Sequence, residues 1–103
     1  MTETVSRKRI DILVDAPLLP RIIKAAESSG IKAHTVFPAL SGAGHAGLWS
    51  DDQITGASAK VLFVAIANAE KVAALADRLE PLLDDYGLVL IISDVQVIRG
   101  GKF

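Results

Sequence analysis

The pattern of hydrophobic and polar residues changes period twice within the first forty positions. Residues 9–15, RIDILVD, alternate apolar and polar side chains, which predicts a strand with one buried face. From residue 17 to 29 the apolar residues recur at helical spacing, and Gly30 supplies a stop signal for that helix. Residues 32–40, KAHTVFPAL, predict a second strand, in which Pro38 marks an edge or a bend. The inward-facing residues expected of the first strand are Ile10, Ile12 and Val14.

A strand and a helix are also predicted in the second half. Residues 59–67, AKVLFVAIA, are apolar on both alternating faces, as expected of a strand that is buried on both sides. Asn68 is a good N-cap for the helix that follows. Because proline lacks a backbone N–H and clashes with the preceding turn, Pro81 should kink or end this helix near Glu80.

The last two apolar stretches complete the pattern. Residues 88–92 predict another strand buried on both faces, and residues 94–98 return to alternation. The order is strand, helix, strand, long loop, strand, helix, strand, which is the α+β, ferredoxin-like βαββαβ arrangement in one domain spanning residues 1–103. Both helices then cover one sheet face, so the apolar side chains of the other face need a cover. A second copy of the chain in a closed homo-oligomer is the simplest one.

The segment between the two halves is the predicted functional element. Residues 41–57, SGAGHAGLWSDDQITGA, form a connection longer than the roughly 12 to 15 residues usual in compact domains, and such connections are often binding loops or disordered segments. Its glycines permit positive φ angles and close approach of a ligand to backbone N–H groups, as in an anion cradle. The alternative is a disordered surface loop. Trp49, the sole tryptophan, is expected at a mobile loop tip that stays free unless it meets a partner or folds onto the body of the domain. The glycines are Gly42, Gly44, Gly47 and Gly56.

The amino-acid composition and net charge exclude several classes of protein function. The chain has 103 residues, of which 50% are hydrophobic and 22% charged, and these values fit one globular domain. A net charge of −1 argues against a nucleic-acid module that is held by phosphate neutralisation. The lack of cysteine excludes disulfides and thiolate zinc sites. Neither a signal sequence nor an apolar run long enough to span a membrane is visible, so we expect a cytoplasmic protein without membrane insertion.

The polar residues give little support for catalysis. His34 and His45 lie on different predicted elements without acidic partners at metal-ligand spacing, so no metal site is expected. Asp51-Asp52 and Asp84-Asp85 are not placed around a substrate as a general acid and base would be. The serines and threonines of the loop have no visible base. The sequence therefore predicts a protein that is not an enzyme.

Two features remain that suit a phosphate group. Gly42-Ala43-Gly44 follows a predicted strand, and the cationic residues Arg99 and Lys102 follow the last one. Backbone donors together with a guanidinium are what a phosphate needs.

Two stretches carry a family resemblance that covers almost the whole chain. RIDILVDAPLLPRIIKAAESSGIKAHTVFPALSGAG and SDVQVIRGGK resemble the first βαβ unit and the final strand of the PII signal-transduction superfamily. The resemblance implies a homotrimer, a T-loop at about residues 41–57 between the second and third strands, and an adenine nucleotide bound between subunits. Carried over by position, Leu13 and Thr35 face the base and ribose, Ile66 the adenine, and Arg99 a phosphate from across the interface. The implied nucleotide-binding residues are Leu13, Thr35, Gly42, Gly44, Lys60, Ile66, Gly87, Arg99 and Lys102.

Departures from the family pattern point to one branch of it. Residues 83–87 stand where classical members have a glycine-rich B-loop with a phosphate-binding lysine, so AMP or ADP is expected rather than ATP. The loop also lacks the tyrosine that is uridylylated in nitrogen-signalling members. The DYG and GAGHAG segments are more similar to the PII-like branch linked to bicarbonate transport and carboxysomes. The chain carries no cysteine-bearing extension of the kind found in some transporter-linked members, which favours the carboxysome-associated group.

These observations predict a non-enzymatic regulator. It would bind AMP or ADP, with bicarbonate as a further ligand, and would signal through its T-loop to an unidentified transporter or carboxysome component. The first alternative is a small hydrolase on the same fold, in which Arg21 and Asn68 would have to converge on one phosphate. The second is an amino-acid-binding or structural oligomer.

Overall fold

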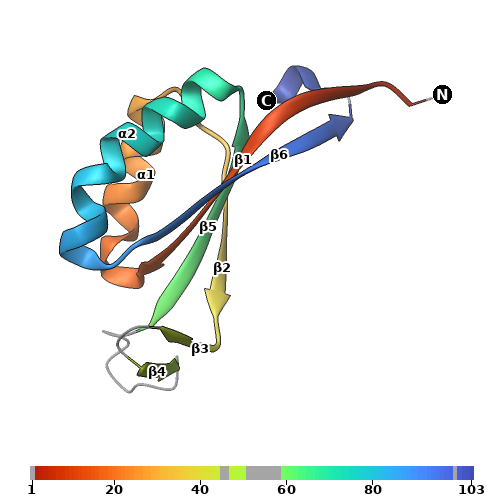
Figure 1. Cartoon of the computed structure of the whole chain (residues 1–103). Coiled ribbons are helices and arrows are strands. Elements are labelled where there is room, and N and C mark those ends of the chain that lie inside the picture. The colour runs from red at the N-terminus through yellow and green to blue at the C-terminus, as the bar shows by residue number, and fades with distance from the viewer. Residues whose placement is uncertain (1, 45–46, 51–58, 99) are drawn as a thin grey trace.

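The computed structural model describes residues 2–44, 47–50, 59–98 and 100–103. Its main sheet has the strand order β2-β5-β1-β6, and every neighbouring pair is antiparallel. Both helices lie on one side of this sheet (Figure 1), which confirms the α+β βαββαβ arrangement. The elements are β1 (Thr4–Asp15), η1 (Ala16–Leu18), α1 (Leu19–Ser28), β2 (Thr35–Ala39), β3 (Ser41–Gly44), β4 (Gly47–Ser50), β5 (Lys60–Ala67), α2 (Ala69–Tyr86), β6 (Val89–Ile98) and η2 (Gly100–Lys102).

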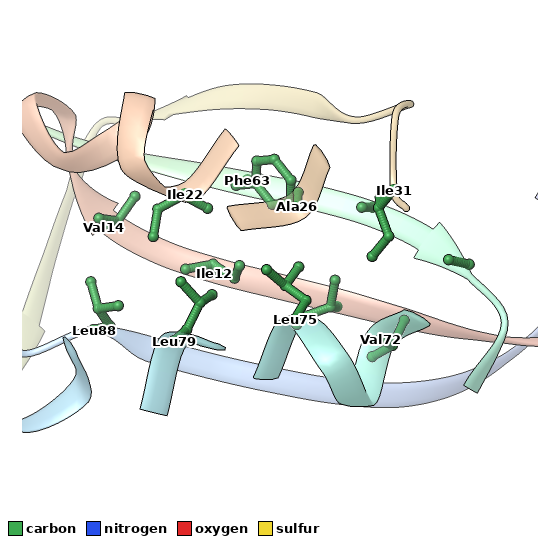
Figure 2. Close-up of a cluster of buried hydrophobic side chains, with 13 residues drawn as sticks. Ile12, Val14, Ile22, Ala26, Ile31, Phe63, Val72, Leu75, Leu79 and Leu88 are labelled. Atoms are coloured by element: carbon green, nitrogen blue, oxygen red, sulfur yellow. The ribbon is translucent and has the colours of Figure 1, made fainter. Parts of the chain in front are cut away.

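One apolar core lies between the sheet and the helices. The alternation of β1 places Ile10 and Ile12 in this core with no exposed surface, as predicted. Phe63, on the neighbouring strand β5, is equally buried and lies opposite Ile12 in the strand register. Figure 2 shows Ile12 and Phe63 lying among the apolar side chains of both helices. The helices, the connection after α1 and the residue before β6 contribute Ile22, Ala26, Ile31, Val72, Leu75, Leu79 and Leu88.

The segment expected to be an irregular loop begins with a hairpin. Ser41–Gly44 and Gly47–Ser50 pair as the antiparallel strands β3 and β4, in a two-stranded sheet of their own. The hairpin projects past the ends of β2 and β5, at the bottom of Figure 1. The expectation of a connection without regular structure was therefore wrong for these residues, because the glycines are compatible with paired strands as well as with turns. Residues 51–57 lie outside the described part of the chain.

Helix α2 begins as predicted but ends later. The Asn68 side chain accepts a hydrogen bond from the backbone N–H of Lys71 at 2.9 Å, which confirms the N-cap. The helix does not end near Glu80, one of the two expected outcomes, because it continues through Pro81 to Tyr86. The apolar stripe extends on both sides of the proline: Leu79 is buried, and the two leucines after Pro81 pack against the core. This packing outweighs the hydrogen bond that proline cannot donate.

Strand β6 is one continuous strand, not two segments. It pairs with β1 from Thr4 opposite Ile98 to Leu13 opposite Val89, and β1 itself starts five residues earlier than the predicted strand. Burial on both faces was predicted for residues 88–92. In the single chain, however, Val89 is 47% exposed and Ile91 is 54% exposed, because no described element of the chain covers the sheet face opposite the helices.

In the described part of the chain, neither helix is long and apolar enough to cross a membrane.

Candidate functional site

The strand register places four of the predicted site residues on one face of the sheet. Residues directly opposite each other in antiparallel strands point to the same face. Leu13 lies opposite Leu62, and Asp15 lies opposite Lys60. Both pairs alternate along the strands with pairs such as Ile12–Phe63, so they point to the other face of the sheet. Thr35 lies opposite Val64 and therefore points to the same side. Since Phe63 and Ile12 point toward the helices, Leu13, Thr35, Lys60 and Ile66 all lie on the opposite face.

A cavity of about 440 Å³ lies where the hairpin meets the main sheet. Strand β5 begins there, and helix α2 ends there, so residues distant in sequence become neighbours. The structure brings together five of the nine residues implied by the family resemblance: Leu13, Gly42, Gly44, Lys60 and Gly87. The remaining lining residues are Ala43, Gly47, Trp49, Tyr86 and Val89.

Trp49 forms one wall of this cavity. It pairs with Gly42 across the hairpin, and the indole lies directly over that glycine. A Cβ atom at Gly42 would be only 2.3 Å from Cζ2 of Trp49, so no other residue fits here without moving the ring. Trp49 is thus half-buried in β4, where its ring packs on the hairpin instead of standing free at a loop tip.

The glycines of β3 differ from the expected cradle. Among the described residues, positive φ angles occur at Gly30, Gly47 and Gly87, but not at Gly42 or Gly44. The backbone of β3 is extended, and Gly44 has open space where a side chain would stand. These two glycines therefore expose backbone to the cavity without adopting left-handed conformations.

Lys60 is a charged side chain of the cavity with two close neighbours. Its Nζ donates a hydrogen bond to Oδ1 of Asp15 at 2.7 Å. The same atom lies 5.5 Å from the centroid of the Trp49 ring, within the range of a cation–π contact. Sequence reasoning missed Asp15 and gave Trp49 no role in the site. The pairing of Asp15 with Lys60 is set by the strand register of the folded sheet, which no local sequence pattern encodes.

The end of α2 closes another side of the cavity. Gly87 ends the helix in the left-handed conformation, with φ +62°, and its N–H bonds to the carbonyl of Leu83. This reversal brings Tyr86 to the cavity wall. The Arg21 guanidinium lies 5.5 Å from the centroid of the Tyr86 ring, and its Nη1 donates to the tyrosine hydroxyl at 3.4 Å. The tyrosine is thus held from α1.

Thr35 and Ile66 do not reach this cavity within one chain. They line a separate hollow of about 160 Å³ together with His34 and Phe103. The His34 ring also stacks on Phe63, with centroids 4.9 Å apart, so the histidine packs at the sheet edge.

The carboxyl-terminal turn is fixed by Arg7. Its Nε donates to the main-chain oxygen of Phe103 at 2.8 Å, and Nη2 donates to the carbonyl of Gly100 at 3.1 Å. The turn packs closely against β1, since a Cβ at Gly100 would be 2.9 Å from Cβ of Val5. Arg99 and the side chain of Lys102 lie outside the described part of the structure.

The arrangement of the polar groups gives no support to the hydrolase alternative. Arg21 lies beside Tyr86 at the end of α2, whereas Asn68 caps its start. Eighteen helical residues separate these points by about 27 Å, so the two side chains do not converge on one phosphate. Within the described ranges, no group of three or more histidine, cysteine or carboxylate side chains could hold a metal ion. His45, Asp51 and Asp52 lie outside these ranges.

A ferredoxin-like sheet with a hairpin beside a cavity at one end defines a small domain of α+β class with a candidate ligand site. Comparison with known families gives a more specific assignment. The family model described as nitrogen regulatory protein P-II matches residues 7–102, and the chain belongs to this family. A search of curated protein sequences found no match.

Solved structures share the fold over 87% to 100% of the chain. The PII-like protein CPII from Thiomonas intermedia K12, solved with ADP, AMP and bicarbonate, superposes with a TM-score of 0.92 at 22% identity, covering 100% of this chain and 98% of that chain. A putative PII-like signalling protein from Thermus thermophilus gives 0.84 at 20% identity, covering 98% of each chain. The GlnK–ATP complex from B. subtilis gives 0.61 at 8% identity, covering 87% of this chain and 82% of that chain.

Proposed function

We propose that this protein is a non-enzymatic PII-like regulator that binds AMP or ADP in the cavity beneath the hairpin and signals through the hairpin and the residues that follow it. The observation that carries the proposal is the composition of the cavity. Five residues implied by family resemblance, from β1, β3, β5 and the end of α2, line one space although they are up to 74 positions apart in the sequence.

The cavity has the size and chemistry for a small phosphorylated ligand. Its volume of about 440 Å³ lies in the usual range for small-molecule sites. Lys60 supplies a cation, and the side-chain-free backbone of Gly42 and Gly44 allows a phosphate to approach closely. Leu13 and Val89 offer apolar surface for a ribose or a base.

A second copy of the chain completes the proposed site. Thr35 and Ile66 share the sheet face of the cavity residues but lie in a different hollow, so they can serve the same ligand only from a neighbouring subunit. The half-exposed apolar residues on that face supply a surface for such a neighbour. We therefore propose a homotrimer, in which Arg99 and Lys102 of one subunit approach the phosphate bound by the next.

The proposed cellular role is in inorganic-carbon regulation in the cytoplasm. The CPII structure was solved with bicarbonate as well as ADP and AMP, which supports bicarbonate as a second ligand here. The hairpin is the element that a target protein, such as a transporter or a carboxysome component, would contact.

Isothermal titration calorimetry tests the proposal. The chain should bind AMP or ADP with micromolar affinity and ATP more weakly, and the titrations should be repeated with bicarbonate. Lys60→Gln should weaken binding by about 1.5 to 3 kcal/mol, as for the loss of one charge-assisted hydrogen bond. Lys24→Gln, at an exposed lysine of α1 that does not line the cavity, is the matched control. Binding of amino acids without any nucleotide would contradict the proposal.

A further inference from the structure

The Lys60 ammonium contacts an acidic side chain and an aromatic ring and also faces the cavity. It pairs with Asp15 at 2.7 Å, it lies 5.5 Å from the Trp49 ring centroid, and it lines the cavity. Among the described residues that line the cavity, it is the one charged side chain. A ligand anion must therefore compete with Asp15 for the same cation.

The pair is open enough for such competition. The side chains of Lys60 and Asp15 retain 24% and 39% of their exposed surface. Ion pairs with this degree of solvent contact contribute little to stability. Replacing Asp15 by a ligand anion as the partner of Lys60 therefore costs little free energy. The Asp15 carboxylate also remains close by after exchange, because it is fixed opposite Lys60 in the strand register.

We propose that Asp15 is a positioning residue that sets how much negative charge the cavity accepts and links anion binding to the hairpin. The inference rests on the proposed function, in which a phosphate group enters this cavity. Each further negative charge on the ligand is repelled by the retained Asp15 carboxylate, which favours AMP over ATP. When Lys60 turns toward the ligand it moves relative to the Trp49 ring, so the cation–π contact between Lys60 and β4 changes with anion occupancy.

The first test needs no nucleotide. Trp49 is the sole tryptophan, so its fluorescence reports on this position alone. Its quenching by iodide, an anion, is compared with quenching by neutral acrylamide in the parent chain and in variants. Asp15→Asn uncovers Lys60 and should raise the iodide-to-acrylamide ratio roughly twofold, because the local potential becomes more positive. Lys60→Gln should lower the ratio, and Asp15→Glu should keep it near the parent value.

Asp11→Asn is the matched control. Asp11 lies on the same strand and the same sheet face, where it accepts a hydrogen bond from Nε of Arg9 at 2.7 Å. The Asp11→Asn variant loses the same charge four residues away from Asp15, and it should leave the iodide-to-acrylamide quenching ratio unchanged. An equal change in the Asp11 and Asp15 variants, or no change in either, would overturn the inference.

The second test separates this inference from the proposed function. Titration of parent and Asp15→Asn with AMP and ATP should show the ATP-to-AMP affinity ratio rising by roughly tenfold in the variant. If both proteins bind nucleotide with the same ratio, Asp15 does not set charge selectivity, although the function stands. If neither binds any nucleotide, the proposed function fails, and the quenching comparison alone decides whether Asp15 controls Lys60.

Discussion

Gly42 shows how a single missing side chain shapes the candidate site. The sequence suggests that Gly42 is part of an anion cradle. In the structure its main role is to leave room for the Trp49 indole, which packs directly on it. The extended backbone of β3 would accept alanine at either glycine of the strand, so the constraint at Gly42 comes from the ring. The two roles are compatible, because the ring that rests on Gly42 is also a wall of the cavity.

Replacing Gly42 should therefore displace the tryptophan. In Gly42→Ala the new methyl group would lie 2.3 Å from Cζ2, and the indole must leave its place. We expect its emission maximum to shift to longer wavelength and acrylamide quenching to rise, as the ring becomes more exposed. Gly44→Ala is the control, since a Cβ there meets no atom within 4 Å. Similar spectra for the two variants would show that the ring does not rest on Gly42.

Helix α2 illustrates the balance between local signals and packing at the scale of one element. The predicted start of the helix at Asn68 is confirmed, because its side chain accepts a hydrogen bond from an otherwise unpaired N–H. This interaction is local and does not depend on the rest of the fold. The stop signal at Pro81 failed because leucines on both sides of it bind the helix to the core. The true end lies at Gly87, where a left-handed residue starts the turn into β6 and helps to shape the cavity.

The cap gives a quantitative prediction. Asn68→Ala leaves the N–H of Lys71 without its acceptor and should lower the free energy of unfolding by about 1 kcal/mol. Asn68→Asp retains a side-chain acceptor and should lose much less. Urea unfolding followed by circular dichroism, at one fixed protein concentration because assembly contributes to stability, measures both values. Equal stability of all three proteins would mean that the cap makes no net contribution.

On the scale of the whole molecule, no element in the described part of the chain covers the sheet face opposite the helices. The side chains there include Val89 and Ile91, about half exposed, and Leu13 opposite Val89 in the register. Apolar side chains gathered on one face are typical of a surface that meets another protein chain. The same face carries the cavity residues, so assembly and ligand binding are expected to depend on each other.

Ile91→Lys tests this dependence. A charged side chain at this place, 54% exposed in the single chain, should prevent burial of the face and reduce the mass in solution. Multi-angle light scattering should give the parent about three times the 10.9 kDa of one chain, and the variant a smaller mass. Ala73→Lys, on the exposed face of α2, should assemble as the parent does. A monomeric parent at micromolar concentration would contradict the homotrimer and the site between subunits.

Much of the fold could be read from the order of the residues, because periodicity is a local property. The alternation in residues 9–15 and the helical spacing around Ile22 already specify which side chains face a core. The resemblance between the chain and PII proteins likewise rests on contiguous stretches, and the family match over residues 7–102 confirms it. It also named five residues that the structure gathers in one cavity.

Tertiary structure alone decided the relations between residues that are far apart. The pairing of Asp15 with Lys60 follows from strand register across 45 positions, and no local pattern encodes it. The register of β2 against β5 sets Thr35 opposite Val64 and Ala39 opposite Lys60, so Thr35 joins Ile66 in a hollow several rows along the sheet from the cavity. Sequence periodicity determines which face a side chain occupies, whereas its neighbours on that face are set by packing, because contact energies act through space and not along the chain.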